Sequence, residues 1–158
     1  MRTRLFAAPL AAATALLLAG CGEHDHAGHD HGGGHSHDSL QGGVAVELGD
    51  HQFQLDLLAV PETGQIKAFI MDAHVENFVR VPLKSFDLVV EPAGGTPRTL
   101  TLEAQANAAS GETVGDTSAF LGTADWLKGV TNFTAILPQL EIRGQAFRGV
   151  AIRYPKSK

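Results

Sequence analysis

The chain from Val44 onward is a succession of short apolar runs separated by turn residues, and this pattern constrains its fold more than any other feature. The runs are rich in Val, Ile, Leu, Phe and Thr, whereas the segments between them contain Gly, Pro, Asp and Asn. Residues of the first kind favour strands and those of the second kind favour turns. The strands that this pattern predicts cover residues 44–48, 51–60, 65–72, 85–91, 98–104, 131–137 and 147–154.

Helical signals are confined to residues 123–129, where Thr123 is a candidate N-cap and Gly129 a candidate stop. Several short strands at this spacing predict an all-β fold over residues 43–158. The expected architecture is an antiparallel immunoglobulin-like sandwich of about seven strands. A small barrel is the alternative, and the sequence does not separate the two.

The predicted strands 51–60 and 65–72 are joined by a Pro-Glu-Thr-Gly turn, which predicts a hairpin. The turn places Val60 opposite Gln65. In that register apolar residues such as Leu55 and Ile70 lie opposite each other on one face of the two strands. We therefore expect one buried face and one solvent-facing face.

The same register brings His51 opposite His74 at the open end of the hairpin. Directly opposed residues have Cβ atoms about 4.5–5.5 Å apart, close enough for both imidazoles to bind one metal ion. Asp72 or Glu76 would then supply an oxygen ligand. The alternatives are a half-exposed pair with a structural role and a register slip caused by a bulge.

A polar tract from Cys21 to Asp38 precedes the predicted strands. It contains six of the chain's eight histidines, separated mainly by Ala, Gly, Asp and Ser, and has no apolar periodicity. Such a segment buries too little apolar surface to offset the entropy of ordering, so residues 21–42 are predicted to be a disordered tether. The histidines form three H-x-H pairs: His24 and His26, His29 and His31, and His35 and His37.

The side chains of this tract indicate metal binding. Neutral imidazole is a common ligand of Zn(II), Cu(II) and Ni(II), and the interleaved carboxylates add oxygen donors. Residues two apart in an extended chain point to the same side, and the glycines at 32–34 allow separate pairs to fold around one ion. The tract has no Met and no free Cys, which argues against a Cu(I) site. A hydrophilic tether that happens to be rich in histidine is the alternative.

The N-terminus has the layout of an export signal. Arg2 and Arg4 precede an apolar run over residues 5–19, which is shorter than a membrane-spanning helix and typical of a secretory signal peptide. The run ends Leu-Ala-Gly-Cys, which resembles the lipobox of bacterial lipoproteins. That resemblance implies that residues 1–20 are removed and that Cys21 is lipidated. An ordinary thiol after a conventional cleavage site is the alternative.

A lipid on Cys21 would anchor the protein to a membrane while its body stays in solution. In lipoproteins of double-membrane bacteria, an aspartate directly after the cysteine favours the inner membrane. Gly22 follows the cysteine in this chain. The resemblance therefore implies the periplasmic side of the outer membrane.

Charge and motifs narrow the function further. The signal holds two of the twelve basic residues and none of the seventeen acidic ones, so the mature chain has a net charge of −7 with neutral histidines. This acidity disfavours nucleic acid as a partner and favours cations. The sequence has no G-x-S-x-G motif and no phosphate-binding glycine loop. His51 and His74 are the only imidazoles that the predicted domain offers for acid–base catalysis, so an enzyme is not expected.

Two segments, H-S-H-D-S-L-Q-G-G-V-A-V-E-L-G-D-H-Q-F and M-D-A-H-V-E-N-F-V-R, resemble stretches of small His-rich lipoproteins that bacteria export. Those proteins have a metal-binding tract ahead of a β-rich domain, and the resemblance covers the tract and roughly the first half of the domain. Related openings occur in periplasmic adaptor subunits of metal-efflux pumps. This chain lacks their long hairpin and lipoyl-like parts, so an adaptor role is not implied.

Together these features predict a membrane-anchored periplasmic protein that binds zinc, copper(II) or nickel. It would buffer the metal or pass it to a transporter. The alternative is a lipid-anchored interaction module that docks a protein partner through a strand edge, with the tract as a spacer. A metal-dependent hydrolase built on His51 and His74 would need further ligands that the sequence hardly supplies.

Overall fold

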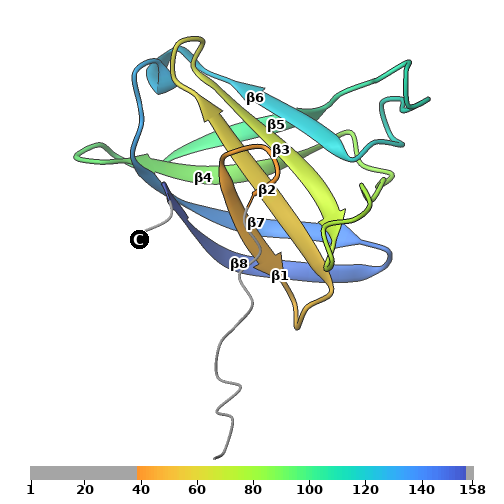
Figure 1. The fold of residues 1–158 in the computed structure, drawn as a ribbon. Coiled ribbons are helices and arrows are strands. Elements are labelled where there is room, and N and C mark those ends of the chain that lie inside the picture. The colour runs from red at the N-terminus through yellow and green to blue at the C-terminus, as the bar shows by residue number, and fades with distance from the viewer. Residues whose placement is uncertain (1–38, 156–158) are drawn as a thin grey trace, which may run out of the picture. The chain divides into compact units, whose positions relative to one another are not determined.

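Eight antiparallel strands and one short 3-10 helix make up residues 39–155, the part of the chain that the computed structural model describes (Figure 1). The predicted all-β, antiparallel class is confirmed. The predicted signal peptide, Cys21 and the tract up to Asp38 lie outside the described residues. The elements are β1 (Val44–Leu48), β2 (Phe53–Val60), β3 (Gln65–Asp72), β4 (Ser85–Pro92), β5 (Arg98–Ala104), β6 (Ala119–Thr123), η1 (Asp125–Leu127), β7 (Phe133–Ile142) and β8 (Gln145–Tyr154).

These strands form one continuous sheet in the order β1-β2-β3-β6-β5-β4-β7-β8, and every neighbouring pair is antiparallel. The sheet curls around a shared core, so that its first and last strands, β1 and β8, come side by side (Figure 1). Within residues 39–155 no ladder joins these two strands. A groove of about 400 Å³ lies between residues 44–47 of β1 and 150–153 of β8, and we call it the β1–β8 seam.

The β2–β3 hairpin has the register that the sequence predicts. Val60 pairs with Gln65, and Leu55 pairs with Ile70. Leu55 and Ile70 are both fully buried. A shift of one residue would turn the apolar side chains of β2 to the outer face, which is why the alternation determines the pairing.

The predicted set of seven strands omits β6, which lies inside the sheet between β3 and β5. This five-residue strand contains Gly122, and a glycine within so short a run weakens its strand signal. The glycine is explained by its neighbours, because a Cβ atom at this position would lie 2.8 Å from the side chain of Leu100. The close approach of β5 to β6 therefore leaves no room for a side chain there.

Strand β7 passes through Pro138 to Ile142 instead of ending at Leu137 as predicted. The β7–β8 ladder skips only the position where Pro138 would face Gly149, which has a φ of 64°. The alternation of buried residues in β7 also shifts by one position there: the buried residues are odd-numbered up to Leu137 and even-numbered after it, at Leu140 and Ile142. Proline donates no ladder hydrogen bond and left-handed glycine bends a strand, so both strands re-aim their side chains and continue.

The predicted helical segment 123–129 is a single 3-10 turn from Asp125 to Leu127. Ala124, rather than Thr123, occupies the N-cap position, and no side chain caps the turn. The amide of Leu127 donates to the carbonyl of Ala124 at 3.0 Å, a bond of the i to i+3 kind. Leu127 is buried, so the turn contributes a side chain to the core.

One core receives buried side chains from all eight strands of the described region. Phe86 and Phe120 meet edge to face within it, with ring centroids 4.9 Å apart. Functional groups are therefore found on the outer face, in the turns and at the ends of the sheet. The core residues that represent the strands are Leu48, Leu55, Ile66, Leu88, Leu102, Phe120, Leu137 and Ile152.

Candidate functional site

His51 lies in the turn between β1 and β2, not in a strand as predicted. Its backbone has a left-handed φ of 50°. Its amide donates to Glu47 Oε1 at 2.8 Å, and its Nδ1 lies 3.3 Å from the same oxygen. The carboxylate of Glu47 at the end of β1 therefore orients both the backbone and the ring of His51.

Asp50 completes a group of three exposed side chains with Glu47 and His51. One ligand atom of each lies within 4.8 Å of those of the other two. Among residues 39–155, it is the one group of three His, Cys, Asp or Glu side chains whose ligand atoms lie this close together. Sequence reasoning missed Glu47 and Asp50, although a Gly-Asp-His turn directly after a strand that carries Glu47 was visible.

Asp72 pairs with Phe53 as predicted, and there the β2–β3 ladder ends. Its Oδ1 accepts a hydrogen bond from the Glu76 amide at 2.9 Å, and its Oδ2 accepts one from Asn77 Nδ2 at 2.8 Å. Desolvation alone would raise the pKa of Asp72, but these hydrogen bonds and the nearby His74 outweigh it and hold the pKa below its usual value. Both carboxylate oxygens thus already have partners.

His74 lies in the turn that follows β3. Because the ladder stops at Phe53 and Asp72, the strand pairing on which a shared His51–His74 site was predicted does not extend to either histidine. The structure places His51 beside Glu47 and Asp50, and Asp72 beside Glu76 and Asn77. A metal ion held jointly by His51, His74 and Asp72 stays a prediction.

Asp56 of β2 attaches the first described residues to the domain. Its carboxylate is fully buried on the side of β2 away from Leu55 and Leu57. It accepts hydrogen bonds from Ser39 Oγ at 3.2 Å, the Leu40 amide at 3.0 Å and Gln54 Nε2 at 2.9 Å. We call this arrangement the Asp56 anchor.

The Asp56 anchor lies at the C-terminal end of the predicted metal-binding tract. The six tract histidines from His24 to His37 are outside the described residues, and only Asp38 stands between His37 and Ser39. A buried carboxylate that accepts three hydrogen bonds is costly to uncover, so Ser39 is a fixed attachment point for whatever precedes it.

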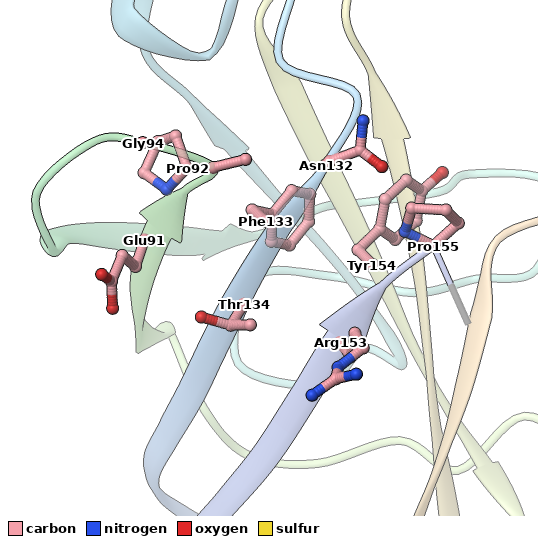
Figure 2. A pocket seen from close by; sticks show the side chains of 10 residues that line it. Glu91, Pro92, Gly94, Asn132, Phe133, Thr134, Arg153, Tyr154 and Pro155 are labelled. Carbon is pink, nitrogen blue, oxygen red and sulfur yellow. The ribbon is translucent and has the colours of Figure 1, made fainter. Parts of the chain in front are cut away.

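A separate hollow of about 520 Å³ lies over the adjoining ends of β4, β7 and β8 (Figure 2). Pro92, Tyr154 and Pro155 give it apolar walls, while Glu91 and Arg153 contribute opposite charges. Sequence reasoning missed this hollow. Only the pairing of three strands, which the sequence does not display, brings these residues together.

No model of a known protein family, no curated protein and no solved structure matches this chain. Within residues 39–155, none of the helical structure is long and apolar enough to cross a bilayer.

Proposed function

We propose that this protein binds divalent transition metal at the periplasmic face of the outer membrane, anchored there by a lipid on Cys21. Zinc is the first candidate, followed by copper(II) and nickel. The single observation that carries the proposal is the tract of six histidines in three H-x-H pairs between a predicted export signal and a folded domain. The protein would buffer the metal or deliver it to a transporter.

The Asp56 anchor supports this proposal because it fixes one end of the tract. Ser39, which bonds to Asp56, follows the last H-x-H pair by two residues. Ligands tethered close to a rigid body lose less entropy on binding an ion than ligands in a free chain. The tract would thus be a chelator attached directly to the surface of a stable domain.

Glu47, Asp50 and His51 would supply a second, weaker set of ligands. Nδ1 of His51 lies 3.3 Å from Glu47 Oε1, so an ion bound to Nδ1 would be within reach of this carboxylate. One imidazole, two carboxylates and a water match the coordination number of zinc. Because all three side chains are exposed, an ion bound there would exchange readily.

Titration calorimetry with zinc at neutral pH tests the tract. The comparison is between the full chain and a length-matched variant in which the six tract histidines are changed to Gln. We expect the variant to lose most zinc equivalents while its unfolding transition stays unchanged. Equal binding by the two proteins would remove the tract from the proposal. The histidines to change are His24, His26, His29, His31, His35 and His37.

A second titration separates the folded ligands from the tract. In the six-Gln background, His51→Gln should abolish the residual weak binding, whereas His74→Gln should leave it in place. If His74→Gln abolishes it as well, the two histidines share one ion. If neither substitution has an effect, the Glu47–Asp50–His51 group is not a ligand set.

The β1–β8 seam favours one competing function, an interaction module whose tract is only a spacer. Two neighbouring strand edges without a ladder between them offer backbone groups to an added strand. Complementation of a deletion strain distinguishes the two functions. Full rescue by the six-Gln variant under both metal excess and metal limitation would favour the interaction module.

A further inference from the structure

Glu47 of β1 and Asp56 of β2 project from the same, outer face of the sheet. Val44 and Leu48 are buried in the core, so the alternation along β1 turns Glu47 outward. Asp56 pairs with Ala45, which lies two residues before Glu47 and therefore shares its face. Diagonal neighbours of this kind are about 7–8 Å apart in an antiparallel pair. The carboxylates of Glu47 and Asp56 thus rise from adjacent points of one surface.

The Asp56 anchor therefore fixes the first described residues beside Glu47. Ser39 Oγ donates to Asp56 Oδ2 at 3.2 Å, and the Leu40 amide donates to the same oxygen at 3.0 Å. Gln54, which pairs with Glu47, donates from Nε2 to Asp56 Oδ1 at 2.9 Å. Because Asp56 and Gln54 are both buried under this arrangement, the position of Ser39 on the outer face is well determined.

His37 and His35 are the tract histidines nearest to this point in sequence. His37 precedes Ser39 by two residues and His35 precedes it by four. An extended chain covers at most about 3.3–3.6 Å per residue, so the backbone of His37 can lie up to about 7 Å from Ser39 and that of His35 up to about 14 Å. With the lengths of the side chains added, both imidazoles can reach Glu47 while Ser39 stays on Asp56.

The other four tract histidines have longer links to the same point. His31 precedes Ser39 by eight residues, and His24 precedes it by fifteen. The effective concentration of a tethered ligand falls as its linker grows beyond the distance to be spanned. The last H-x-H pair therefore has the highest effective concentration near Glu47.

The turn between β1 and β2 presents ligands for an ion at this place. Glu47, Asp50 and His51 have ligand atoms within 4.8 Å of one another, and zinc takes four nitrogen, oxygen or sulfur ligands. We propose that the pair His35 and His37 completes this set, so that one Zn(II) ion binds the tract and the turn together and holds the end of the tract on the outer face of β1. This inference rests on the proposed metal binding by the tract and adds where the ion is held.

A double-mutant cycle in the full chain tests whether the two sets of ligands share one ion. His35→Gln with His37→Gln, and separately His51→Asn, should each weaken the tightest zinc equivalent in titration calorimetry about tenfold. All three substitutions together should weaken it no further. Asparagine is used at position 51 because it adopts left-handed backbone readily, and urea denaturation verifies the fold. Losses that add would mean separate ions and would overturn the inference.

The first H-x-H pair provides the matched control. His24→Gln with His26→Gln also removes two imidazoles, but at the far end of the tract. In that background His51→Asn should still weaken the tightest zinc equivalent about tenfold. If the first pair is coupled to His51 as strongly as the last pair is, the Asp56 anchor does not select the ligands and the inference is wrong.

Amide chemical shifts distinguish a failure of this inference from a failure of the proposed function. One equivalent of zinc should shift the amide signals of Asp50 and His51, and His35→Gln with His37→Gln should abolish these shifts. If zinc binds the full chain tightly but leaves both amides unmoved, the shared site is wrong and metal binding by the tract stands. If the full chain binds no zinc, both proposals fall. Zinc-dependent dimers in light scattering would show an ion between two chains and would also overturn the inference.

Discussion

The hydroxyl of Tyr154 accepts a hydrogen bond from the backbone amide of Ala59 at 3.3 Å, across 95 positions of sequence. Strand β1 pairs with β2 only as far as Leu57, so Ala59 lies beyond the end of β1. At this end of the β1–β8 seam, a side chain of the last strand thus bonds to the second strand where a backbone ladder is missing. This polar contact joins β8 to β2 at one end of the seam.

This contact predicts the effect of Tyr154→Phe. The substitution keeps the ring that stacks on Phe133 and removes only the hydrogen bond to Ala59. We expect a loss of about 1 kcal/mol in the free energy of unfolding, measured by urea denaturation. Faster amide exchange at Ala59 should accompany it. Unchanged stability together with unchanged exchange at Ala59 would show that water replaces the Tyr154 hydroxyl as the acceptor for this amide without loss.

The Asp56 anchor predicts a larger loss for Asp56→Ala. The substitution leaves the donors of Ser39, Leu40 and Gln54 without their acceptor, at a cost of about 1–3 kcal/mol. Hydrogen exchange should rise most at the Leu40 amide. Asp87→Ala is the matched control, because Asp87 accepts only an exposed hydrogen bond from Thr101. Equal losses for the two variants would contradict the role of Asp56 as an attachment point.

The lowered pKa of Glu112 predicts how the free energy of unfolding depends on pH. Burial alone would raise its pKa, but hydrogen bonds from Ser118 and Ser110 and the nearby Arg80 outweigh burial and lower the pKa below its ordinary value of 4.5. A carboxyl with a lowered folded-state pKa stabilises the fold above the unfolded-state pKa, and this contribution is lost as the pH falls through the folded-state value. The free energy of unfolding should therefore decrease on acidification below about pH 4.5.

Glu112→Gln tests this assignment, because glutamine does not titrate. The variant should be less stable than the parent at neutral pH, and its stability should change less between neutral pH and about pH 3. Denaturant titrations across that range measure both effects. Parallel pH profiles for the two proteins would assign the acid sensitivity to other carboxyl groups, such as Asp72, whose pKa is also lowered.

The left-handed backbone of Gly149, where β8 bends, limits which side chains can replace this glycine. At its φ of 64°, Gly149→Val should destabilise the domain by more than about 1 kcal/mol, because branched side chains avoid left-handed backbone. Gly149→Asn should cost less, since asparagine adopts that region more readily. Thermal unfolding ranks the two variants. A Cβ atom at this position would meet nothing within 4 Å, so the opposite order would show that the backbone angle does not limit the choice of side chain.

Metal binding by the histidine tract should depend steeply on pH. Protons compete for imidazole near an unperturbed pKa of about 6.5, so zinc affinity should fall as the medium is acidified through that value. Zinc titrations of the full chain at about pH 7.5 and about pH 5.5 measure the change. An affinity that is equal at both values would point to carboxylates rather than histidines as the ligands.

The sequence predicts most accurately where side-chain alternation and turn chemistry agree. The β2–β3 register follows from the Pro-Glu-Thr-Gly turn and from apolar residues at every second position. Strand β6 was not predicted because it contains Gly122. The glycine is needed because the side chain of Leu100, which is distant in sequence, leaves no room for a Cβ atom there. The extension of β7 past Pro138 escapes for a similar reason, since Gly149 opposite it accommodates the bend.

The site residues are less predictable than the strands because turns position them. His51 is two residues from a correctly predicted pair, yet its left-handed backbone takes it out of the ladder and next to Glu47. The hollow over β4, β7 and β8 depends on β4 lying beside β7, and this neighbourhood has no local signal. The sequence thus shows which residues could take part in chemistry. Which of them lie next to one another depends on the order of the strands in the sheet.

The Asp56 anchor also sets a length scale for the whole protein. If Cys21 carries a lipid, as proposed, eighteen residue steps separate that residue from Ser39, which bonds to β2. A fully extended chain of that length covers at most about 60–65 Å. Ser39 would then be confined to within that radius of the bilayer. An ion that draws the H-x-H pairs together would shorten the radius and pull the domain inward.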